Sequence, residues 1–268
     1  MINFIKGDAL EELKKLPSAS VNTCVTSPPY WALRNYETEG QLGLESTPEE
    51  YILNLTKVFK EVKRVLRGDG TLWLNIADTY CGTGHKGAAS APKYKGRNAQ
   101  SFALNNKVKG VKKKELIGLP WRLAFALQQQ GWYLRQDIIW YKPNCMPEPV
   151  KDRCTKSHEY IFLFSKNQKY YYDYEAIKEE GAKQGTKRNK RSVWQINTEP
   201  FKGAHFAVMP SELAEQCILA GCPEGGTVLD PFGGAGTTGL VAKSQKRNSI
   251  LIELNQEYID IAKSRTSP

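Results

Sequence analysis

A short apolar strand that runs into two consecutive prolines is the feature that most constrains how this chain folds. Residues Val21 to Val25 form an apolar run, and Ser27-Pro28-Pro29-Tyr30 follows it after one threonine. The run predicts a buried strand, which the prolines end just beyond its last residue. In an open α/β sheet, ligands bind at the carboxyl ends of the strands. The sequence therefore predicts a rigid turn at the ligand-binding edge of an α/β sheet.

This turn has the groups needed to hold a planar ring that bears an amino group. Its prolines donate no backbone N–H, so the carbonyls of Ser27 and Pro28 could face a ligand as fixed acceptors. Tyr30 and Trp31 offer flat faces on which such a ring could stack. The alternative is a proline turn packed by two aromatic side chains, with no ligand. This motif alone does not decide between them.

A second stretch, from Thr227 to Thr238, has the pattern of a strand, a glycine turn and the start of a helix. Glycines let the backbone approach a ligand closely, and a helix N-terminus offers free N–H groups. No Gly-Lys-Ser/Thr follows, which excludes a phosphate-binding P-loop. The glycine spacing also differs from the dinucleotide-binding pattern.

Together the two motifs resemble those of the amino-group DNA methyltransferases. The motifs are Ser-Pro-Pro-Tyr at 27–30 and Asp-Pro-Phe-x-Gly-x-Gly-Thr-Thr at 230–238, in the order of the family's permuted beta group. The resemblance covers nearly the whole chain, from Phe4-Ile5-Lys6-Gly7-Asp8 to Ile250-Leu251-Ile252-Glu253. It implies an α/β fold, with a doubly wound, mostly parallel, seven-stranded sheet and basic loop insertions. It also implies a single catalytic domain over residues 1–268.

The resemblance implies that S-adenosyl-L-methionine is the cofactor and that particular residues hold it. These residues are Asp8, Phe206, Asp230, Phe232, Gly234, Gly236, Thr237 and Glu253. Asp8 would contact the adenine end of the cofactor, and Glu253 would accept hydrogen bonds from ribose hydroxyls. Asp8 is also well suited to cap the helix expected after it, and both roles can coexist.

The catalytic residues implied by the resemblance are Ser27, Pro28, Pro29 and Tyr30. The Ser27 side chain and the Pro28 carbonyl would bind the hydrogens of an exocyclic amine, and Tyr30 would stack on a base flipped out of the duplex. Methyl transfer would be direct, with no covalent enzyme intermediate. In the family, Ser before Pro-Pro favours cytosine N4, whereas Asp or Asn favours adenine N6. Ser27 therefore favours cytosine, although physical chemistry alone does not exclude adenine.

The net charge of +10 is concentrated in two segments that lack regular periodicity. Residues 81–115 contain nine basic residues against one acidic residue, and residues 178–191 contain six against two. This pattern predicts a polyanionic partner, although solvated lysine-rich loops are the alternative. We expect 81–115 to be a DNA-contacting insertion and 178–200 to be a target-recognition loop. The predicted DNA-binding residues are Lys112, Lys113, Lys114, Arg188, Lys190 and Arg191.

Other sequence features limit the partners and the cellular location. No run approaches the roughly 18 apolar residues of a membrane span, and no signal peptide is visible, so we expect a cytoplasmic protein. The six cysteines are scattered without a Cys-x-x-Cys pair, and we expect no metal site. Double-stranded DNA is the expected partner, a restriction endonuclease is a further candidate, and the chain would act as a monomer or homodimer.

Several alternatives remain open from the sequence. The chain could be a catalytically silent DNA-binding module, or it could methylate RNA. His158-Glu159 could form an acid/base pair, but the chemistry needs no histidine, so we expect only a hydrogen bond at a strand start. Residues 170–174 are expected to pack as an edge of the sheet.

Overall fold

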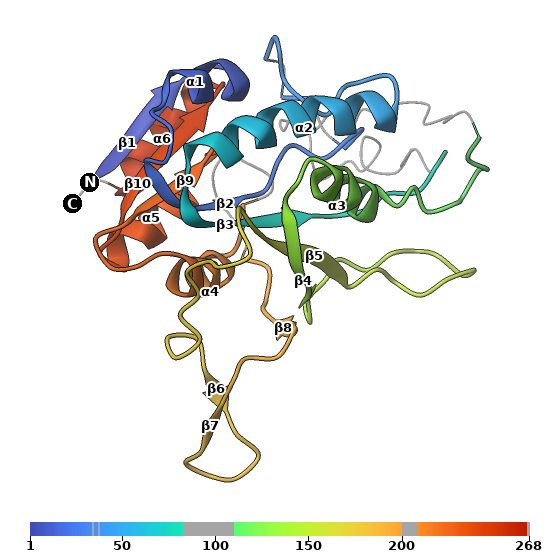
Figure 1. Ribbon diagram of the computed structural model, residues 1–268. Coiled ribbons are helices and arrows are strands. Elements are labelled where there is room, and N and C mark those ends of the chain that lie inside the picture. Colours follow the sequence, from blue (N-terminus) through green and yellow to red (C-terminus); the bar gives the residue numbers. More distant parts are fainter. Residues whose placement is uncertain (34, 37, 83–109, 200–207, 267–268) are drawn as a thin grey trace.

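An eight-stranded sheet forms the centre of the molecule (Figure 1). The computed structural model describes residues 1–33, 35, 36, 38–82, 110–199 and 208–266. Across the sheet, the strands lie in the order β1 (Ile2–Lys6), β10 (Asn248–Glu253), β9 (Thr227–Asp230), β2 (Val21–Thr26), β3 (Leu66–Ile76), β5 (His158–Ser165), β4 (Tyr133–Tyr141) and β8 (Val193–Gln195). A separate two-stranded hairpin is formed by β6 (Glu179–Glu180) and β7 (Lys187–Arg188).

Most neighbouring strands in the sheet are parallel, which confirms the predicted fold class. The strands from β1 to β3 are all parallel, β5 is antiparallel to both β3 and β4, and β8 is parallel to β4. The sheet has one strand more than predicted, because the short β8 pairs with the end of β4. Only Trp194 of β8 is buried, so its sequence carries no apolar pattern that marks a strand.

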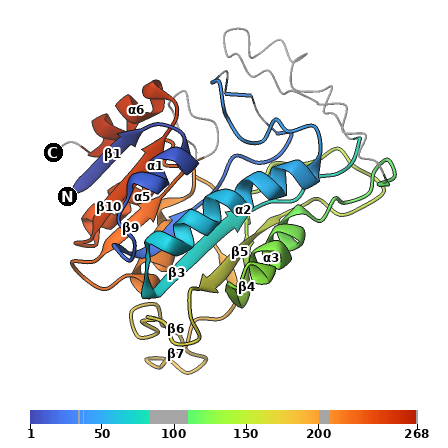
Figure 2. The ribbon, with the colours of Figure 1, turned by 45° about the horizontal axis from the view of Figure 1, so that its top comes forward.

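The helices of the described ranges cover both faces of the sheet, and Figure 2 views the sheet from the side that α2 and α3 cover. One face carries α1 (Ala9–Lys15), α2 (Pro48–Val65) and α3 (Leu119–Gln129), and the other carries α4 (Ser211–Gly221), α5 (Thr237–Ser244) and α6 (Gln256–Thr266). Helix α2 begins as its sequence predicts: the Thr47 side chain accepts a hydrogen bond from the Glu50 N–H, and Pro48 occupies the first turn.

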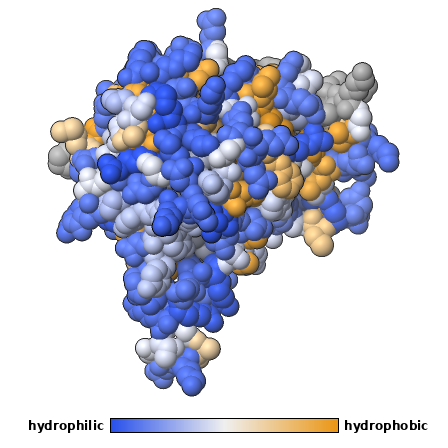
Figure 3. Space-filling view, viewed as in Figure 1, coloured by the Kyte–Doolittle hydropathy of each residue, from blue (hydrophilic) through white to orange (hydrophobic). Residues whose placement is uncertain are grey.

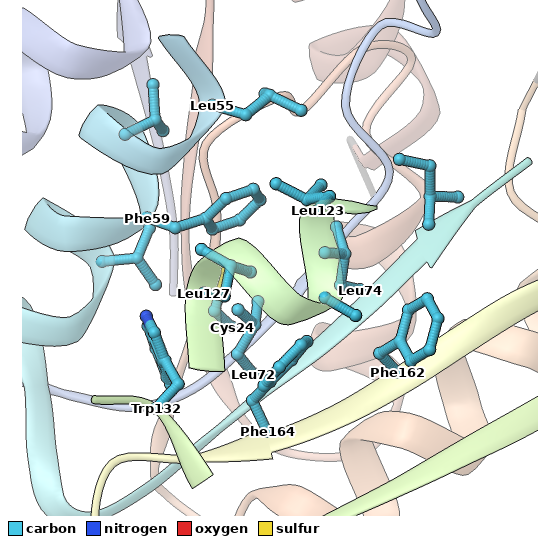
Figure 4. Close-up of a cluster of buried hydrophobic side chains, with 14 of the residues drawn as sticks. Cys24, Leu55, Phe59, Leu72, Leu74, Leu123, Leu127, Trp132, Phe162 and Phe164 are labelled. Carbon is cyan, nitrogen blue, oxygen red and sulfur yellow. The ribbon is translucent and has the colours of Figure 1, made fainter. Parts of the chain in front are cut away.

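The core beneath α2 and α3 holds the strands that lead into the candidate site. Leu55 and Phe59 of α2 meet Leu123 and Leu127 of α3 over the sheet (Figure 4). A second cluster, under α4 and α5, includes the buried Trp73 and packs against the opposite face. The strand ends are therefore held from both sides by closely packed side chains.

Two sequence-based boundaries differ from the structure. Helix α2 ends at Val65, close to the end at Leu66 that its sequence predicts, but the following strand, expected over 71–76, begins earlier, because β3 starts at Leu66 and includes Gly68 and Gly70. Residues 170–174 form no strand; instead, the Tyr172 ring stacks on Trp73 with 6.2 Å between ring centroids. The tyrosines in this segment pack through their rings, so they show no strand alternation.

The connections on the two sides of the β9–β2 pair run in opposite directions across the sheet. From β9 the chain passes through α5 to β10, whereas from β2 it passes through α2 to β3. Such a topological switch point opens a crevice at the carboxyl ends of the strands, where ligands bind in open α/β sheets. Both sequence motifs begin at this point, because Ser27 follows β2 and Pro231 follows β9.

Candidate active site

The crevice at the switch point is a cavity of about 540 Å³ that both sequence motifs line. This volume is in the range of small-molecule binding sites. Its lining includes all but two of the predicted catalytic and cofactor-binding residues: Asp8, Ser27, Pro28, Pro29, Tyr30, Asp230, Phe232, Gly234, Thr237 and Glu253. Gly236 does not line the cavity, and Phe206 lies outside the described residues.

The Ser-Pro-Pro-Tyr turn is fixed by contacts with its surroundings. The buried Tyr51 of α2 donates a 2.8 Å hydrogen bond from its hydroxyl to the Pro29 carbonyl. Gly43, with φ +95°, approaches so closely that a β-carbon there would lie 3.0 Å from the Tyr30 carbonyl oxygen. Trp31 is buried and donates from its indole N–H to the Glu45 carbonyl. The prediction that Trp31 offers a stacking face is therefore wrong, because its ring belongs to the core.

Beside Ser27, a cluster of polar side chains surrounds the Tyr30 hydroxyl. That hydroxyl donates to Glu159 Oε2 at 2.8 Å, lies 3.3 Å from Asn75 Oδ1, and accepts from Ser27 Oγ at 3.3 Å. The Glu159 carboxylate also accepts from Asn75 Nδ2 at 3.0 Å and forms an ion pair with Lys142. Burial, and then the Glu159 charge, raises the pKa of Tyr30, so its hydroxyl keeps its proton.

Asn75, Lys142 and Glu159 also line the cavity, although they are not among the residues predicted from the sequence. Glu159 was expected to make only a hydrogen bond at the strand start, but its side chain lines the cavity and contacts Tyr30, Asn75 and Lys142. The signal that could have revealed it is the direction of β5. An antiparallel strand brings its amino end to the edge where parallel strands place their carboxyl ends.

On the other side of the cavity, the Asp230 carboxylate holds the two motifs together. Its Oδ1 accepts from the Thr26 hydroxyl at 2.6 Å and from the Phe232 N–H at 3.1 Å, and its Oδ2 accepts from the Thr238 hydroxyl at 2.7 Å. The residue is 4% exposed. Burial raises the pKa of Asp230, although these hydrogen bonds oppose the shift.

The glycines of the turn have different tasks. Gly234 lines the cavity and donates its N–H to Glu253 Oε2 at 2.8 Å. Gly236 instead faces α6: its φ is +79°, and a β-carbon there would lie 2.7 Å from the Ala262 β-carbon. Its absence from the cavity lining therefore has a packing reason, since the turn must pass close to a neighbouring helix.

Two further carboxylates stand at the ends of outer strands, as the sequence predicts. Asp8, which follows β1, caps α1 by accepting from the Glu11 N–H at 3.0 Å, and it lines the cavity as well. Glu253 ends β10 and accepts one backbone N–H on each oxygen, from Gly234 and from Asn255. Burial raises the pKa of Glu253. Each of its oxygens retains a lone pair that a ligand hydroxyl could use.

The segment after the Ser-Pro-Pro-Tyr turn reaches across the cavity to α6. The rings of Tyr36 and Tyr258 meet edge to face with 6.1 Å between centroids, and both residues line the cavity. Asn255 donates to the Thr38 hydroxyl at 3.4 Å. A ligand in the cavity would thus be covered by a loop joined to the far side of the crevice.

The first basic segment leaves the sheet at the edge where the cavity lies. Directly after β3, the backbone of Cys81 pairs with that of Glu115, which places Lys112 to Lys114 near the carboxyl ends of the strands. Lys112, Lys113 and Lys114 are all exposed, and Lys114 also forms a 2.6 Å ion pair with Asp152. Most of the insertion, residues 83–109, lies outside the described residues.

The second basic segment lies farther from the cavity. Arg188, Lys190 and Arg191 precede β8, which runs parallel to β4 toward the cavity edge, so they lie toward the opposite edge. The hairpin projects from the body of the molecule with a hydrophilic surface (Figures 1 and 3). Arg188 and Arg191 both form ion pairs with Glu179, and Lys190 lies 5.4 Å from the centroid of the Trp194 ring.

The described part of the chain contains neither a candidate metal site nor a candidate membrane-spanning helix. Within the described ranges, no group of three or more His, Cys, Asp or Glu side chains is placed to hold a metal ion. Of the helices in that same part of the chain, none combines the length and the apolar character needed to cross a bilayer.

Comparison with known proteins agrees with this geometry. M.SmaI of Serratia marcescens and M.Cfr9I of Citrobacter freundii, both named Type II methyltransferases, are 54% and 53% identical to the chain; each match covers 98% of the chain, and 89% and 86% of the respective relative. The PvuII DNA methyltransferase (cytosine-N4-specific) shares the fold, with a TM-score of 0.75 at 22% identity, over 100% of this chain and 86% of that one.

A second solved structure is a putative DNA modification methylase of Thermus thermophilus, complexed with S-adenosyl-L-methionine. Its TM-score is 0.66 at 26% identity, and the match covers 99% of this chain and 95% of that one. The family model N6_N4_Mtase, described as DNA methylase, matches residues 21–264. The chain therefore belongs to the N6/N4 DNA methylase family.

Proposed function

We propose that this DNA methylase uses S-adenosyl-L-methionine to methylate the exocyclic N4 of cytosine in double-stranded DNA. The observation that carries the proposal is the meeting of the two motifs in one cavity. Thr26, which precedes Ser27, donates its hydroxyl to Asp230 at the start of the glycine turn. A group bound at Ser27 and a group bound at the glycine turn would therefore lie next to each other.

The cavity has the hydrogen-bond acceptors and apolar surfaces that the cofactor needs. Glu253 has free lone pairs for ribose hydroxyls, and Asp8 stands at the end of the neighbouring strand β1. Phe232 and Ile252 add apolar surface. We propose that these residues, with Asp230, Gly234 and Thr237, form the cofactor site. When bound, S-adenosyl-L-methionine supplies an electrophilic methyl group.

The Ser-Pro-Pro-Tyr turn would hold the acceptor base. We propose that the Ser27 hydroxyl and the Pro28 carbonyl accept the two amine hydrogens, while Pro29 keeps the turn rigid. The charge that develops on the nitrogen would be stabilised by these fixed dipoles. The hydrogen bond from the Tyr30 hydroxyl to Glu159 fixes the edge of its ring, so the face of the ring could stack on a flipped base.

The choice of cytosine rests on Ser27. The cytosine-N4-specific PvuII enzyme shares the fold, but at 22% identity this similarity carries no weight for the choice of base. Adenine N6 is therefore the alternative target, with the same residues and the same direct transfer. A silent DNA-binding module is a weaker alternative, because both motifs line the same cavity and hydrogen bonds to Asp230 and to the Pro29 carbonyl hold them in place.

Partners follow from the same proposal. We propose that Lys112 and Lys113, exposed on the segment that follows β3, contact DNA phosphates. Lys114, Arg188, Lys190 and Arg191 remain predicted contacts, although each already has a partner within the chain. Because the relatives are named Type II methyltransferases, a restriction endonuclease of the same specificity is the expected companion. Such a pair would act on cytoplasmic DNA.

The proposal can be tested with acceptors whose amino groups are blocked. One DNA template is amplified with N4-methylcytosine in place of cytosine, another with N6-methyladenine in place of adenine, and a third with ordinary nucleotides. Label from S-adenosyl-L-methionine should enter the ordinary template and the N6-methyladenine template, but not the N4-methylcytosine template. The opposite result would indicate adenine N6. RNA of the same sequence tests the RNA alternative, and Ser27→Ala controls for background labelling.

A further inference from the structure

We propose that Glu159 is a positioning residue for methyl transfer: through the Tyr30 hydroxyl, it orients the Ser27 hydroxyl so that the serine oxygen accepts from the substrate amine. This inference rests on the proposed function, because it concerns the amine that Ser27 would bind. It adds to that function a residue of β5, far in sequence from both motifs.

Glu159 reaches the cavity from β5, whereas the two motifs follow β2 and β9. It is the second residue of β5 and pairs in register with Trp140 of β4. Its side chain is 14% exposed and lines the cavity that Ser27 also lines. A nearly buried carboxylate must be paired or hydrogen-bonded to remain there.

The partners of Glu159 divide between its two oxygens. Oε1 accepts from Lys142 Nζ, whose positive charge also lies 4.0 Å from the centroid of the Trp140 ring. Oε2 accepts from the Tyr30 hydroxyl and from Asn75 Nδ2. Asn75 is itself oriented by a 3.1 Å hydrogen bond to the Tyr160 carbonyl. The carboxylate is therefore held in one orientation, with one oxygen directed at Tyr30.

The hydrogen of the Tyr30 hydroxyl has two acceptors within reach, and charge decides between them. Glu159 Oε2 is nearer, at 2.8 Å, than Asn75 Oδ1, at 3.3 Å. A hydrogen bond to an ionised oxygen is also the stronger of the two. The tyrosine hydrogen therefore points at Glu159, and the tyrosine oxygen is left to accept from Ser27, 3.3 Å away.

The consequence for Ser27 follows from its single hydrogen. When that hydrogen is donated to Tyr30, the serine oxygen can act toward the cavity only as an acceptor. An amine that must lose electron delocalisation into its ring needs acceptors for its hydrogens. The two hydroxyls and the carboxylate also polarise one another in the same direction, which strengthens the serine oxygen as an acceptor.

The alternative explanation is that Glu159 only ties β5 to its neighbours. The two explanations differ in what Glu159→Gln does when Tyr30 is intact and when it is not. A glutamine has nearly the same shape, but one of its two polar ends is a donor. If that end faces Tyr30, the tyrosine hydrogen must turn away. If it faces Lys142, the lysine ammonium group loses its acceptor and meets the amide NH₂ group, which is also a donor.

The decisive experiment is a double-mutant cycle on the single-turnover rate of methyl transfer to DNA. Glu159→Gln and Tyr30→Phe should each lower the rate by roughly 100-fold, comparable to the loss of one preorganised group in other active sites. The double variant should be no slower than Tyr30→Phe, because both changes break the same chain of hydroxyls. Cofactor affinity should change by less than about twofold, since neither residue belongs to the proposed cofactor site.

Glu148→Gln serves as the matched control, because Glu148 forms an ion pair with Arg153 and does not line the cavity. It should keep the wild-type rate. Wild-type transfer by Glu159→Gln, or losses that multiply in the double variant, would overturn the inference and leave the proposed function standing. A wild-type chain that transfers no methyl group to any DNA would overturn both. Loss of cofactor binding in Glu159→Gln would show a structural role instead.

Discussion

Replacing Asp230 with alanine should separate cofactor binding from general stability. The Asp230 side chain accepts hydrogen bonds from the hydroxyls of Thr26 and Thr238 and from the Phe232 N–H, and it is almost completely buried. Asp230→Ala removes all three acceptor contacts at once. The glycine turn then loses its side-chain hydrogen bond to Thr26, the residue that leads into the Ser-Pro-Pro-Tyr turn.

The lost hydrogen bonds set the cost of Asp230→Ala in the free energy of unfolding. The two threonine hydroxyls can turn to other acceptors, but the Phe232 N–H is fixed by the backbone. Leaving a buried donor without a partner costs about 1–3 kcal/mol, and each lost bond to a charged group about 1.5–3 kcal/mol. Part of this loss is offset, because burial disfavours the charged carboxylate, as its raised pKa shows, and the substitution removes that charge. We expect a net loss of about 2–4 kcal/mol in the free energy of unfolding.

Cofactor binding should fall by more than stability alone explains. Because the residues from Phe232 to Ala235 line the cavity, releasing the turn should weaken the affinity for S-adenosyl-L-methionine at least about tenfold, or about 1.4 kcal/mol. Calorimetric titration of folded protein measures this affinity, and chemical denaturation measures the stability. Leu127→Ala is the matched control: it removes a fully buried core side chain of α3 that does not line the cavity, at a cost of about 2–5 kcal/mol. If Asp230→Ala bound cofactor as tightly as Leu127→Ala does, the role assigned to the glycine turn would be refuted.

Three further predictions follow from single contacts. Gly236→Ala should lower the free energy of unfolding by at least about 1–2 kcal/mol, because of the positive φ at 236 and the nearby Ala262; chemical denaturation measures this, and an unchanged midpoint would contradict it. Tyr51→Phe, which removes the donor to the Pro29 carbonyl, should cost about 0.5–1.5 kcal/mol and slow methyl transfer; an unchanged single-turnover rate would show that the turn needs no such support. Burial raises the pKa of Asp230 above its ordinary value of 3.8, so its ionisation opposes folding. The free energy of unfolding of the wild type, relative to that of Asp230→Asn, should therefore fall as the pH rises from 3.8 through the folded-state pKa. Denaturation curves at several pH values measure this difference, and a difference that does not change with pH would contradict the prediction.

Local patterns were enough to predict one half of the site. The apolar run before Ser27 and the strand before Asp230 could be recognised from their residues, and parallel strands place their carboxyl ends at one edge. The sequence could not show that Thr26 donates to Asp230, but the rules of open sheets already bring the two turns together. The cap formed by Asp8 was likewise visible, because it depends only on neighbouring residues.

The other half depends on tertiary contacts that no local pattern encodes. Glu159 and Lys142 reach the cavity only because β5 reverses direction between β3 and β4. An apolar run predicts a strand but not its direction. Trp31 was misassigned for a similar reason: an aromatic residue after a turn can face a ligand or the core, and here the indole is buried against the loop that returns to Glu45.

The basic segments show a further limit of composition. Clustered charge predicts a polyanionic partner wherever it lies, but only the fold shows which cluster lies near the cavity. Lys112 and Lys113 lie on the segment that follows β3 at the edge of the sheet where the cavity opens, whereas Arg188 and Arg191 are held by Glu179 on a projecting hairpin. The sequence gives no sign of that pairing, because Glu179 reaches across the hairpin to both arginines.

The N4 of cytosine is the methyl acceptor that we propose for this cavity. The most direct measurement is to incubate the chain with S-adenosyl-L-methionine carrying a deuterated methyl group and with unmethylated DNA, and to identify the modified nucleoside by mass spectrometry. We predict deuterated N4-methylcytosine with the wild-type chain and none with Ser27→Ala. Deuterated N6-methyladenine would contradict the role given to Ser27 in base choice. No modified nucleoside, from DNA of varied sequence and with cofactor binding intact, would contradict the proposed methyl transfer to DNA itself.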